Sequence, residues 1–249
     1  MSLLGIERHG SGPLLVWLHG FTQTQRSAHE FRSILAGTYE VLTIDLPGHG
    51  QNASISASLE ETADQLARAL PAEPFILGGY SFGGRVALHF TLRHPERLSR
   101  LVLLGATRGI ADPVERAQRR ERDNALADHI EEVGASAFLD EWLALPMFAS
   151  LPSDPTERAT RSVDPHGLAM SLRLAGTGTQ TWLGGALGEV VVPTLALAGA
   201  LDEKFSREAR AIAGTVRHGA AMLIPRAGHA AHLEQPAATA ALVSGVQPQ

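Results

Sequence analysis

The chain has 249 residues, with 21 basic and 26 acidic side chains and a formal net charge of −5. This length fits one large α/β domain, with or without an inserted subdomain, and the acidic balance argues against nucleic-acid or membrane-surface partners, which need a basic excess. The absence of cysteine excludes disulfides and thiolate metal sites and fits a reducing compartment. We recognise no signal peptide and no membrane-spanning run, so we expect a cytoplasmic protein.

Short apolar runs alternate with helical patterns along most of the chain, which is typical of a mostly parallel sheet flanked by helices. The predicted strands are Leu14–Leu18, Val41–Ile44, Phe75–Gly78, Leu101–Leu104, Thr194–Ala198 and Ala221–Ile224. Two clear helices are predicted between them. One runs from Ser58 to Leu70 and starts with a Ser-Leu-Glu-Glu capping box, and the other runs from Gly83 to Arg93 and stops before Pro95.

The alternation stops between Arg108 and about Leu187, where no run resembles a strand. Helical patterns over Val114–Val133 and Ala135–Leu143 are followed by a proline-marked segment, 146–165, and a further helical stretch. We interpret residues 108–187 as an all-helical lid inserted over the sheet. Residues 1–107 and 188–249 are then expected to form the α/β core.

The most informative motif is G-x-S-x-G, present as Gly79-Tyr80-Ser81-Phe82-Gly83. It follows a predicted strand and precedes a predicted helix, which is the context that a nucleophile turn requires. Small residues on both sides of Ser81 would allow a strained turn that projects its hydroxyl at the helix N-terminus. This context favours a catalytic serine over an incidental one.

A serine hydroxyl needs a histidine to take its proton, and the histidine needs an acid that fixes its tautomer. Asp202 follows the strand Thr194–Ala198, and His229 follows the strand that ends at Ile224. Both positions lie at the carboxyl ends of strands, where ligands bind in open α/β sheets. The order serine, aspartate, histidine predicts a triad of Ser81, Asp202 and His229.

Three residues compete for the last two places in this triad. His232 is three residues beyond His229 and is expected to start the final helix or to support the site from behind. Asp45 also ends a strand, but it lies in the turn Asp45–Gly50, where an aspartate usually caps its own loop. Glu203 neighbours Asp202 and could replace it, although the position of Asp202 is preferred.

The first predicted strand ends in a His19-Gly20-Phe21 turn. In a serine-centred site on this kind of sheet, such a turn supplies one backbone N–H of the oxyanion hole, and the residue after the serine supplies the other. We therefore expect the amides of Phe21 and Phe82 to stabilise negative charge that develops on the substrate.

These motifs resemble the α/β-hydrolase superfamily across essentially the whole chain. A narrower set of residues is similar to the family of 2-succinyl-6-hydroxy-2,4-cyclohexadiene-1-carboxylate synthases of menaquinone biosynthesis. That set comprises Arg85 after the serine turn, Glu115-Arg116 and Arg119, Phe138–Trp142 leading into Pro146–Leu151, Arg161-Ser162, and the tail Ile224–His232. The resemblance implies an α/β-hydrolase fold with a helical lid.

The resemblance also implies a lyase reaction, the elimination of pyruvate from an enolpyruvyl cyclohexene that carries succinyl and carboxylate groups. Ser81, polarised by His229 and Asp202, would remove the proton alpha to the succinyl ketone, and the enolate would expel the enolpyruvyl oxygen. The roles implied for other residues are enolate stabilisation by the Phe21 and Phe82 amides, carboxylate binding by Arg85, Arg119 and Arg161, and shaping of the pocket by Tyr80 and Trp142.

Arginine makes up 20 of the 21 basic residues, and Lys204 is the only lysine. A GC-rich genome explains most of this bias, but a polycarboxylate substrate also benefits from planar, permanently charged guanidinium groups. Lys204, two residues past the predicted triad aspartate, is a candidate for the rim of the pocket. The histidines show no metal-ligand spacing, so we expect neither a metal nor a cofactor.

Two other functions remain open at this point. A carboxylesterase or a hydrolase of carbon–carbon bonds would use the same triad, and its lid would be expected to be apolar. The lid arginines favour an anionic substrate only weakly, because acidic residues outnumber them in the same segment. A ligand-binding receptor that keeps the triad for sensing is the second alternative. The expected partner is a small-molecule polycarboxylate, with the protein a monomer or a weak homo-oligomer.

Overall fold

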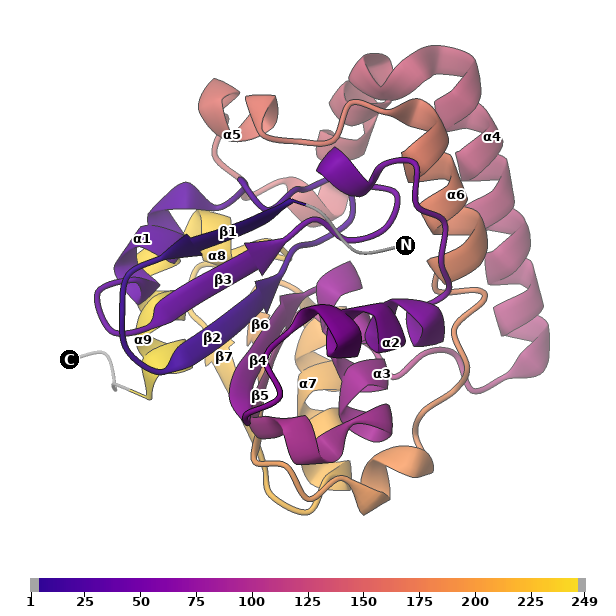
Figure 1. Cartoon of the computed structure of the whole chain (residues 1–249). Helices are drawn as coiled ribbons and strands as arrows, with labels where there is room; N and C mark the ends of the chain where they lie inside the picture. The colour runs from indigo at the N-terminus through magenta and orange to yellow at the C-terminus, as the bar shows by residue number, and fades with distance from the viewer. Residues whose placement is uncertain (1–4, 246–249) are drawn as a thin grey trace.

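The structure is a computed structural model that describes residues 5–245. Its centre is a seven-stranded sheet in the order β1-β3-β2-β4-β5-β6-β7, in which only β1 runs antiparallel to its neighbour (Figure 1). The strands are β1 (Ile6–His9), β2 (Leu14–Leu18), β3 (Glu40–Ile44), β4 (Phe75–Tyr80), β5 (Leu98–Leu104), β6 (Thr194–Gly199) and β7 (Gly219–Ile224). The six predicted strands are confirmed, most of them with slightly wider bounds.

Strand β1 was not predicted. It is four residues long, pairs only with β3 at the edge of the sheet, and is largely exposed. Such a strand lacks the run of buried branched residues that marks the parallel strands.

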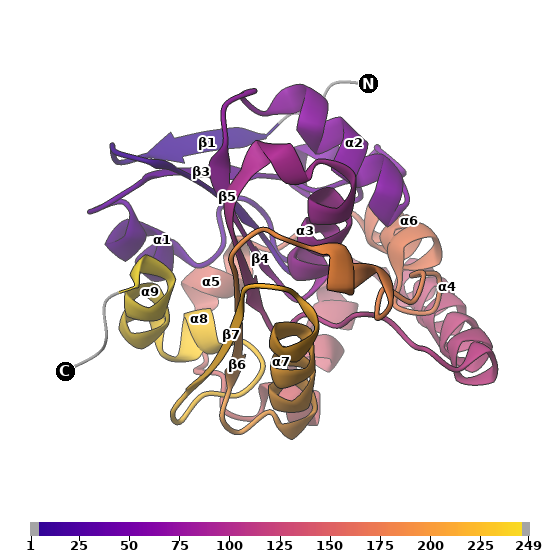
Figure 2. The same ribbon diagram turned by 90° about the horizontal axis from the view of Figure 1, so that it is seen from below.

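Helices cover both faces of the sheet, which agrees with the predicted α/β-hydrolase fold (Figure 2). On one face lie α1 (His29–Leu35), α8 (Ala231–Glu234) and α9 (Pro236–Ser244), and on the other lie α2 (Leu59–Ala69), α3 (Phe82–Arg93) and α7 (Glu203–Thr215). Short 3₁₀ turns span Gly50–Asn52, Pro95–Arg97, Pro146–Phe148 and Ala186–Glu189. The predicted capping box at Ser58 is confirmed, because its hydroxyl accepts a hydrogen bond from the Glu61 amide and the Glu61 carboxylate accepts one from the Ser58 amide.

Each central strand contributes to two apolar layers. In β2, Val16 and Leu18 join the layer beneath α2, α3 and α7, whereas Leu15 and Trp17 join the layer beneath α1, α8 and α9. Successive side chains of a strand point to opposite faces, so a strand covered on both sides is apolar at every position. The central strands are therefore packed on both faces, and the six parallel strands have their carboxyl ends at one edge of the sheet.

Between β5 and β6 the chain forms the predicted helical insertion, with α4 (Pro113–Leu143), α5 (Pro155–Ala159) and α6 (Pro165–Ala175). Gly134, with φ 81°, interrupts α4 at the junction between the two predicted helices. Figure 1 shows α4 and α6 side by side at the right of the view, and they share a small apolar core of their own. Leu183 and Leu187 instead pack in the main core, so we propose that the lid ends with α6 rather than at residue 187.

None of the helices within residues 5–245 combines the length and the apolar character needed to cross a membrane.

Candidate active site

Ser81 occupies a strained turn between β4 and α3. Its backbone has φ 49° and ψ −102°, a conformation that places the serine at the start of α3. The motif glycines explain why the turn can form. A Cβ on Gly79 would overlap the Gly83 backbone, and a Cβ on Gly83 would overlap the carbonyl oxygen of Leu18. The G-x-S-x-G spacing is thus a steric requirement for holding a serine at a helix N-terminus.

Two hydrogen bonds join the three residues predicted as the triad. His229 Nε2 lies 3.0 Å from Ser81 Oγ, and His229 Nδ1 lies 2.8 Å from Asp202 Oδ2. The His229 ring is buried against Phe205, with ring centroids 4.4 Å apart. This geometry lets the imidazole accept the serine proton while the carboxylate fixes its tautomer.

The surroundings of Asp202 keep its carboxylate ionised. Burial acts to raise the pKa of the Asp202 carboxyl, but the hydrogen bonds from His229 and the Phe205 amide, with the charge of Lys204, hold that pKa below its usual value. Glu234 orders the loop around His229, because its carboxylate accepts hydrogen bonds from the amides of Gly228 and Ala230 at 2.6 and 3.0 Å.

The backbone amides of Phe21 and Phe82 are available to a ligand. Within residues 5–245, neither amide donates a hydrogen bond, whereas the neighbouring Gly20 amide donates to Gln23 Oε1 and the Thr22 amide to His49 Nε2. Phe82 is the first residue of α3, so its amide also lies at the positive end of the helix dipole. Both residues line the same cavity, so their amides stay the candidates for the predicted oxyanion hole.

Two buried histidines support the loop that carries Phe21. His19 Nε2 accepts a hydrogen bond from the Leu46 amide, and its Nδ1 donates to the Gly20 carbonyl. Burial lowers the pKa of His19 to about 4 and that of His49 to about 3, which keeps both rings neutral and able to accept these hydrogen bonds. The His49 ring also stacks on Phe82, with centroids 5.5 Å apart.

Ser81 opens into a cavity of about 500 Å³ between the sheet and the lid. The cavity is strongly positive for a protein of net charge −5. Among the described residues that line it, Glu208 is the one carboxylate, and it is paired with Arg108. The predicted substrate-binding residues all line this cavity, namely Tyr80, Arg85, Arg119, Trp142, Arg161 and Lys204.

Arg85 and Arg119 differ in how their charges are compensated. Arg85 is buried, donates from Nη1 to the Ala175 carbonyl at 2.7 Å, and has no carboxylate within 4.0 Å in the described part of the chain. Burial, with the charge of Arg119, lowers the pKa of Arg85 to about 10. Arg119 is partly exposed and donates to Asp123 Oδ1 at 2.7 Å. Arg85 is therefore the guanidinium with most to gain from an anionic ligand.

Arg161, Lys204 and Arg207 complete the positive lining. Arg161 is 6% exposed, and its Nη1 donates to Thr22 Oγ1 at 2.7 Å. The Lys204 ammonium lies 5.2 Å from the centre of the Phe205 ring, and burial and the charge of Arg119 lower its pKa. Tyr80 is buried beside His229 and His232, and Trp142 packs against Phe21.

The structure separates the triad from its three competitors. His232 is the second residue of the short helix α8 and does not start the final helix, α9; it is buried and packs against Tyr80, which also contacts His229. One carboxylate oxygen of Asp45 accepts a hydrogen bond from the Gln51 amide next to its own turn, and the other accepts one from the Gln25 amide in the loop before α1. Glu203 is exposed on α7. Within residues 5–245, no cluster of histidines and carboxylates is arranged to hold a metal ion.

Sequence reasoning missed the supporting residues Thr22, His49 and Glu234. Each supports the catalytic loops through hydrogen bonds that form only in the folded chain, and none lies in a motif with a fixed spacing. The sequence offered one signal for these three residues, the position of His49 inside the Asp45–Gly50 turn.

Comparisons with known proteins agree with this geometry. The family model described as "Alpha/beta hydrolase family" matches residues 15–242. The 2-succinyl-6-hydroxy-2,4-cyclohexadiene-1-carboxylate synthase of Yersinia pestis bv. Antiqua (strain Nepal516) is 35% identical over 246 residues, covering 94% of this chain and 86% of the relative. The structure of MenH from S. aureus has a TM-score of 0.91 and 32% identity, covering 98% and 97% of the two chains. A malate-bound thermophilic esterase from Thermogutta terrifontis has a TM-score of 0.82 and 25% identity, covering 96% and 91%. The chain belongs to the alpha/beta hydrolase family.

Proposed function

We propose that the protein is a carbon–oxygen lyase that eliminates pyruvate from 2-succinyl-5-enolpyruvyl-6-hydroxy-3-cyclohexene-1-carboxylate. The product is 2-succinyl-6-hydroxy-2,4-cyclohexadiene-1-carboxylate, an intermediate of menaquinone biosynthesis. The observation that carries the proposal is the grouping of Arg85, Arg119 and Arg161 around the cavity into which Ser81 opens. A substrate with three carboxylates suits several guanidinium groups in one enclosed space. The names of the Yersinia and S. aureus relatives support the same reaction.

In the proposed mechanism, His229 Nε2 accepts the Ser81 proton and Ser81 Oγ removes the proton alpha to the succinyl ketone. The electron pair of that C–H bond forms an enolate, whose oxygen accepts hydrogen bonds from the Phe21 and Phe82 amides. Collapse of the extended enolate breaks the carbon–oxygen bond to the enolpyruvyl group. The leaving enolpyruvate gains a proton and becomes pyruvate, and the ring becomes a conjugated diene. Asp202 stabilises the imidazolium that forms in the first step.

The arginines would bind the carboxylates that remain ionised throughout the reaction. Each charge-assisted hydrogen bond in such a site contributes about 1.5 to 3 kcal/mol. Arg85 and Arg161 are held at fixed positions by Ala175 and Thr22, so little side-chain entropy is lost when they bind. Lys204, which is exposed and lines the cavity, would interact with a carboxylate nearer its opening.

The proposal is tested by giving purified protein the enolpyruvyl substrate, generated in situ, and following pyruvate with a coupled assay. We expect release far faster than the spontaneous elimination, and expect the Ser81→Ala variant to lose that acceleration. A wild-type rate equal to the spontaneous rate would contradict the proposal.

Ester hydrolysis is the second candidate, because the triad is complete and the T. terrifontis esterase has a similar fold. It predicts turnover of small neutral esters at rates comparable with those of the enolpyruvyl substrate. The positive cavity favours the lyase. The expectations of a cytoplasmic protein, of a monomer or weak homo-oligomer and of independence from cofactors stay predictions.

A further inference from the structure

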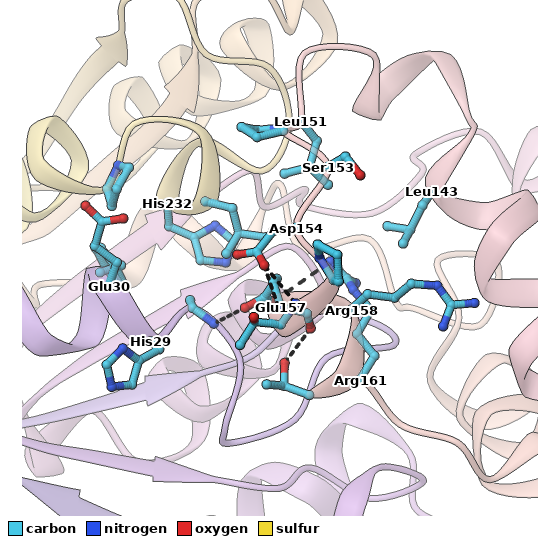
Figure 3. A pocket seen from close by; sticks show the side chains of 18 of the residues that line it. His29, Glu30, Leu143, Leu151, Ser153, Asp154, Glu157, Arg158, Arg161 and His232 are labelled. Carbon is cyan, nitrogen blue, oxygen red and sulfur yellow. Dashed lines mark hydrogen bonds and ion pairs between the residues drawn. The ribbon is translucent and has the colours of Figure 1, made fainter.

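Arg161 separates two cavities. Arg161 lines the cavity of Ser81 and also a second cavity of about 780 Å³ between α1, α5 and α8. Among the described residues, Arg161 is the one residue that lines both cavities. Figure 3 shows the second cavity, with Arg161 and Glu157 on its wall. A guanidinium in this position serves the reaction only if something holds it toward the Ser81 side.

The hydrogen bonding of Arg161 is unusually sparse for a buried cation. Within residues 5–245, the hydroxyl of Thr22 is the one acceptor of a hydrogen bond from its guanidinium, at 2.7 Å, and Nε has no partner. Glu157 lies on the second-cavity side, with its Oε1 4.0 Å from Arg161 Nη2, and its Oε2 is occupied by the Ala28 amide at 2.8 Å. The direct restraint on Arg161 therefore comes from Thr22.

Thr22 joins the loop that carries Phe21 to the lid through two of its polar groups, the carbonyl and the hydroxyl, while its amide binds His49 of the core. Its amide donates to His49 Nε2 at 3.3 Å, its carbonyl accepts from the Ser162 amide at 2.8 Å, and its hydroxyl accepts from Arg161. It follows Phe21 directly, so one residue connects an oxyanion donor with a carboxylate-binding group that is 139 positions away.

The backbone of Thr22 is strained. Its φ is 68°, in the left-handed region that β-branched residues rarely adopt, and its side chain is fully buried. Such strain persists only where the surroundings over-determine the conformation, and it concentrates at functional sites. Glycine would relieve it, so the presence of threonine points to a use for the hydroxyl.

We propose that Thr22 is a positioning residue that holds the Arg161 guanidinium on the Ser81 side of the boundary between the two cavities. The hydroxyl of Thr22 sets the orientation in which Arg161 meets a substrate carboxylate, and the Phe21 amide next to it stays in register with that carboxylate. This proposal rests on the proposed function, because it assumes that Arg161 binds a carboxylate in the Ser81 cavity.

The test is a double-mutant cycle between Thr22→Val and Arg161→Ala. Thr22→Val keeps the β-branch and removes the acceptor, and we expect kcat/KM for the enolpyruvyl substrate to fall about 10-fold, mainly through KM. In the Arg161→Ala background the same change should have less than about a twofold effect. Thr22→Ser, which restores the hydroxyl, should recover most of the wild-type value.

A matched control is Thr24→Val. Thr24 lies in the same loop and its hydroxyl also donates to the lid, to the Thr160 carbonyl, but it does not contact Arg161. Its loss should change kcat/KM by less than about twofold at equal thermal stability. A Thr22→Val effect of the same size with and without Arg161, or one matched by Thr24→Val, would overturn the proposal and assign Thr22 to loop stability alone.

Binding of 2-succinylbenzoate, a stable aromatic compound with a succinyl ketone and two carboxylates, provides a readout that needs no turnover. Calorimetry should show about 10-fold weaker binding to Thr22→Val and near-normal binding to Thr22→Ser. If wild-type protein released no pyruvate, the proposed function would fail, whereas this binding series would still decide the role of Thr22. Unchanged binding in Thr22→Val would overturn the positioning role even if pyruvate release were confirmed.

Discussion

Removing Arg85 is the most informative single perturbation of the cavity. Arg85 is 8% exposed, and its guanidinium donates one hydrogen bond to the Ala175 carbonyl and has no carboxylate within 4.0 Å among the described residues. A substrate carboxylate would supply the missing counter-charge. If Arg85→Met removes one charge-assisted contact, about 1.5 to 3 kcal/mol of transition-state binding is lost, or roughly 10- to 200-fold in kcat/KM.

The effect of Arg85→Met on folding should be small. Methionine fills a similar volume and removes a desolvated charge, whereas the Ala175 carbonyl loses its partner, and these effects oppose each other. The assay compares pyruvate release with hydrolysis of a small neutral ester, which needs Ser81 but no carboxylate contact. Arg173→Met is the matched control, because Arg173 is a lid arginine paired with Asp128 and Glu131 and lies outside the lining of the Ser81 cavity. Equal losses on both substrates would show that Arg85 is structural and refute the reasoning.

Three further predictions follow from the geometry. Asp202→Asn should lower kcat for pyruvate release by on the order of 10³- to 10⁴-fold with little change in KM, because the amide favours the wrong tautomer of His229. Stopped-flow or coupled assays measure this loss, and a change in kcat below tenfold would contradict the role of Asp202 in the triad. Gly83→Ala should abolish activity and lower the melting temperature, because the new Cβ would overlap backbone atoms. Gly214→Ala, a control in α7 with open space around it, should raise the melting temperature slightly. Equal activity and melting temperature in the two variants would contradict the steric requirement for glycine in the Ser81 turn. Burial lowers the pKa of both His49 and His232 to about 3, below the value of 6.5 in the unfolded chain. Between these two pH values the unfolded state binds more protons than the folded state. The free energy of unfolding should therefore fall as the pH drops from about 6.5 toward 3. Each histidine would contribute roughly 1 kcal/mol per pH unit, and urea unfolding of His232→Gln should show a shallower fall.

Sequence reasoning located the parts of the site that depend on local geometry. The turn around Ser81 needs glycines at fixed spacing, and Asp202 and His229 follow recognisable strands, so motif and position together were sufficient. The expectation that the Phe21 and Phe82 amides form the oxyanion hole rests on position as well, and it stays a prediction. The parallel strands were equally visible, because burial on two faces makes every residue apolar.

The remaining features depend on how distant segments dock. Thr22 meets Arg161 only after α5 of the lid packs against the loop that precedes α1, and the two residues share no spacing in the chain. Glu234 acts on backbone amides of its own loop, which any carboxylate at a suitable distance could do. Strand β1 has too few buried residues to produce a periodic pattern. These contacts are set by tertiary packing, which local sequence patterns do not encode.

In the proposed reaction, Ser81 acts as the base in an elimination within a positively charged cavity. The most direct measurement follows pyruvate and the conjugated cyclohexadiene together, in one sample, with the enolpyruvyl substrate carrying deuterium alpha to the succinyl ketone. We predict equimolar formation of both products, a slower rate with the deuterated substrate, and loss of the accelerated reaction in Ser81→Ala. Undiminished acceleration in Ser81→Ala, or pyruvate released without the diene, would contradict the account.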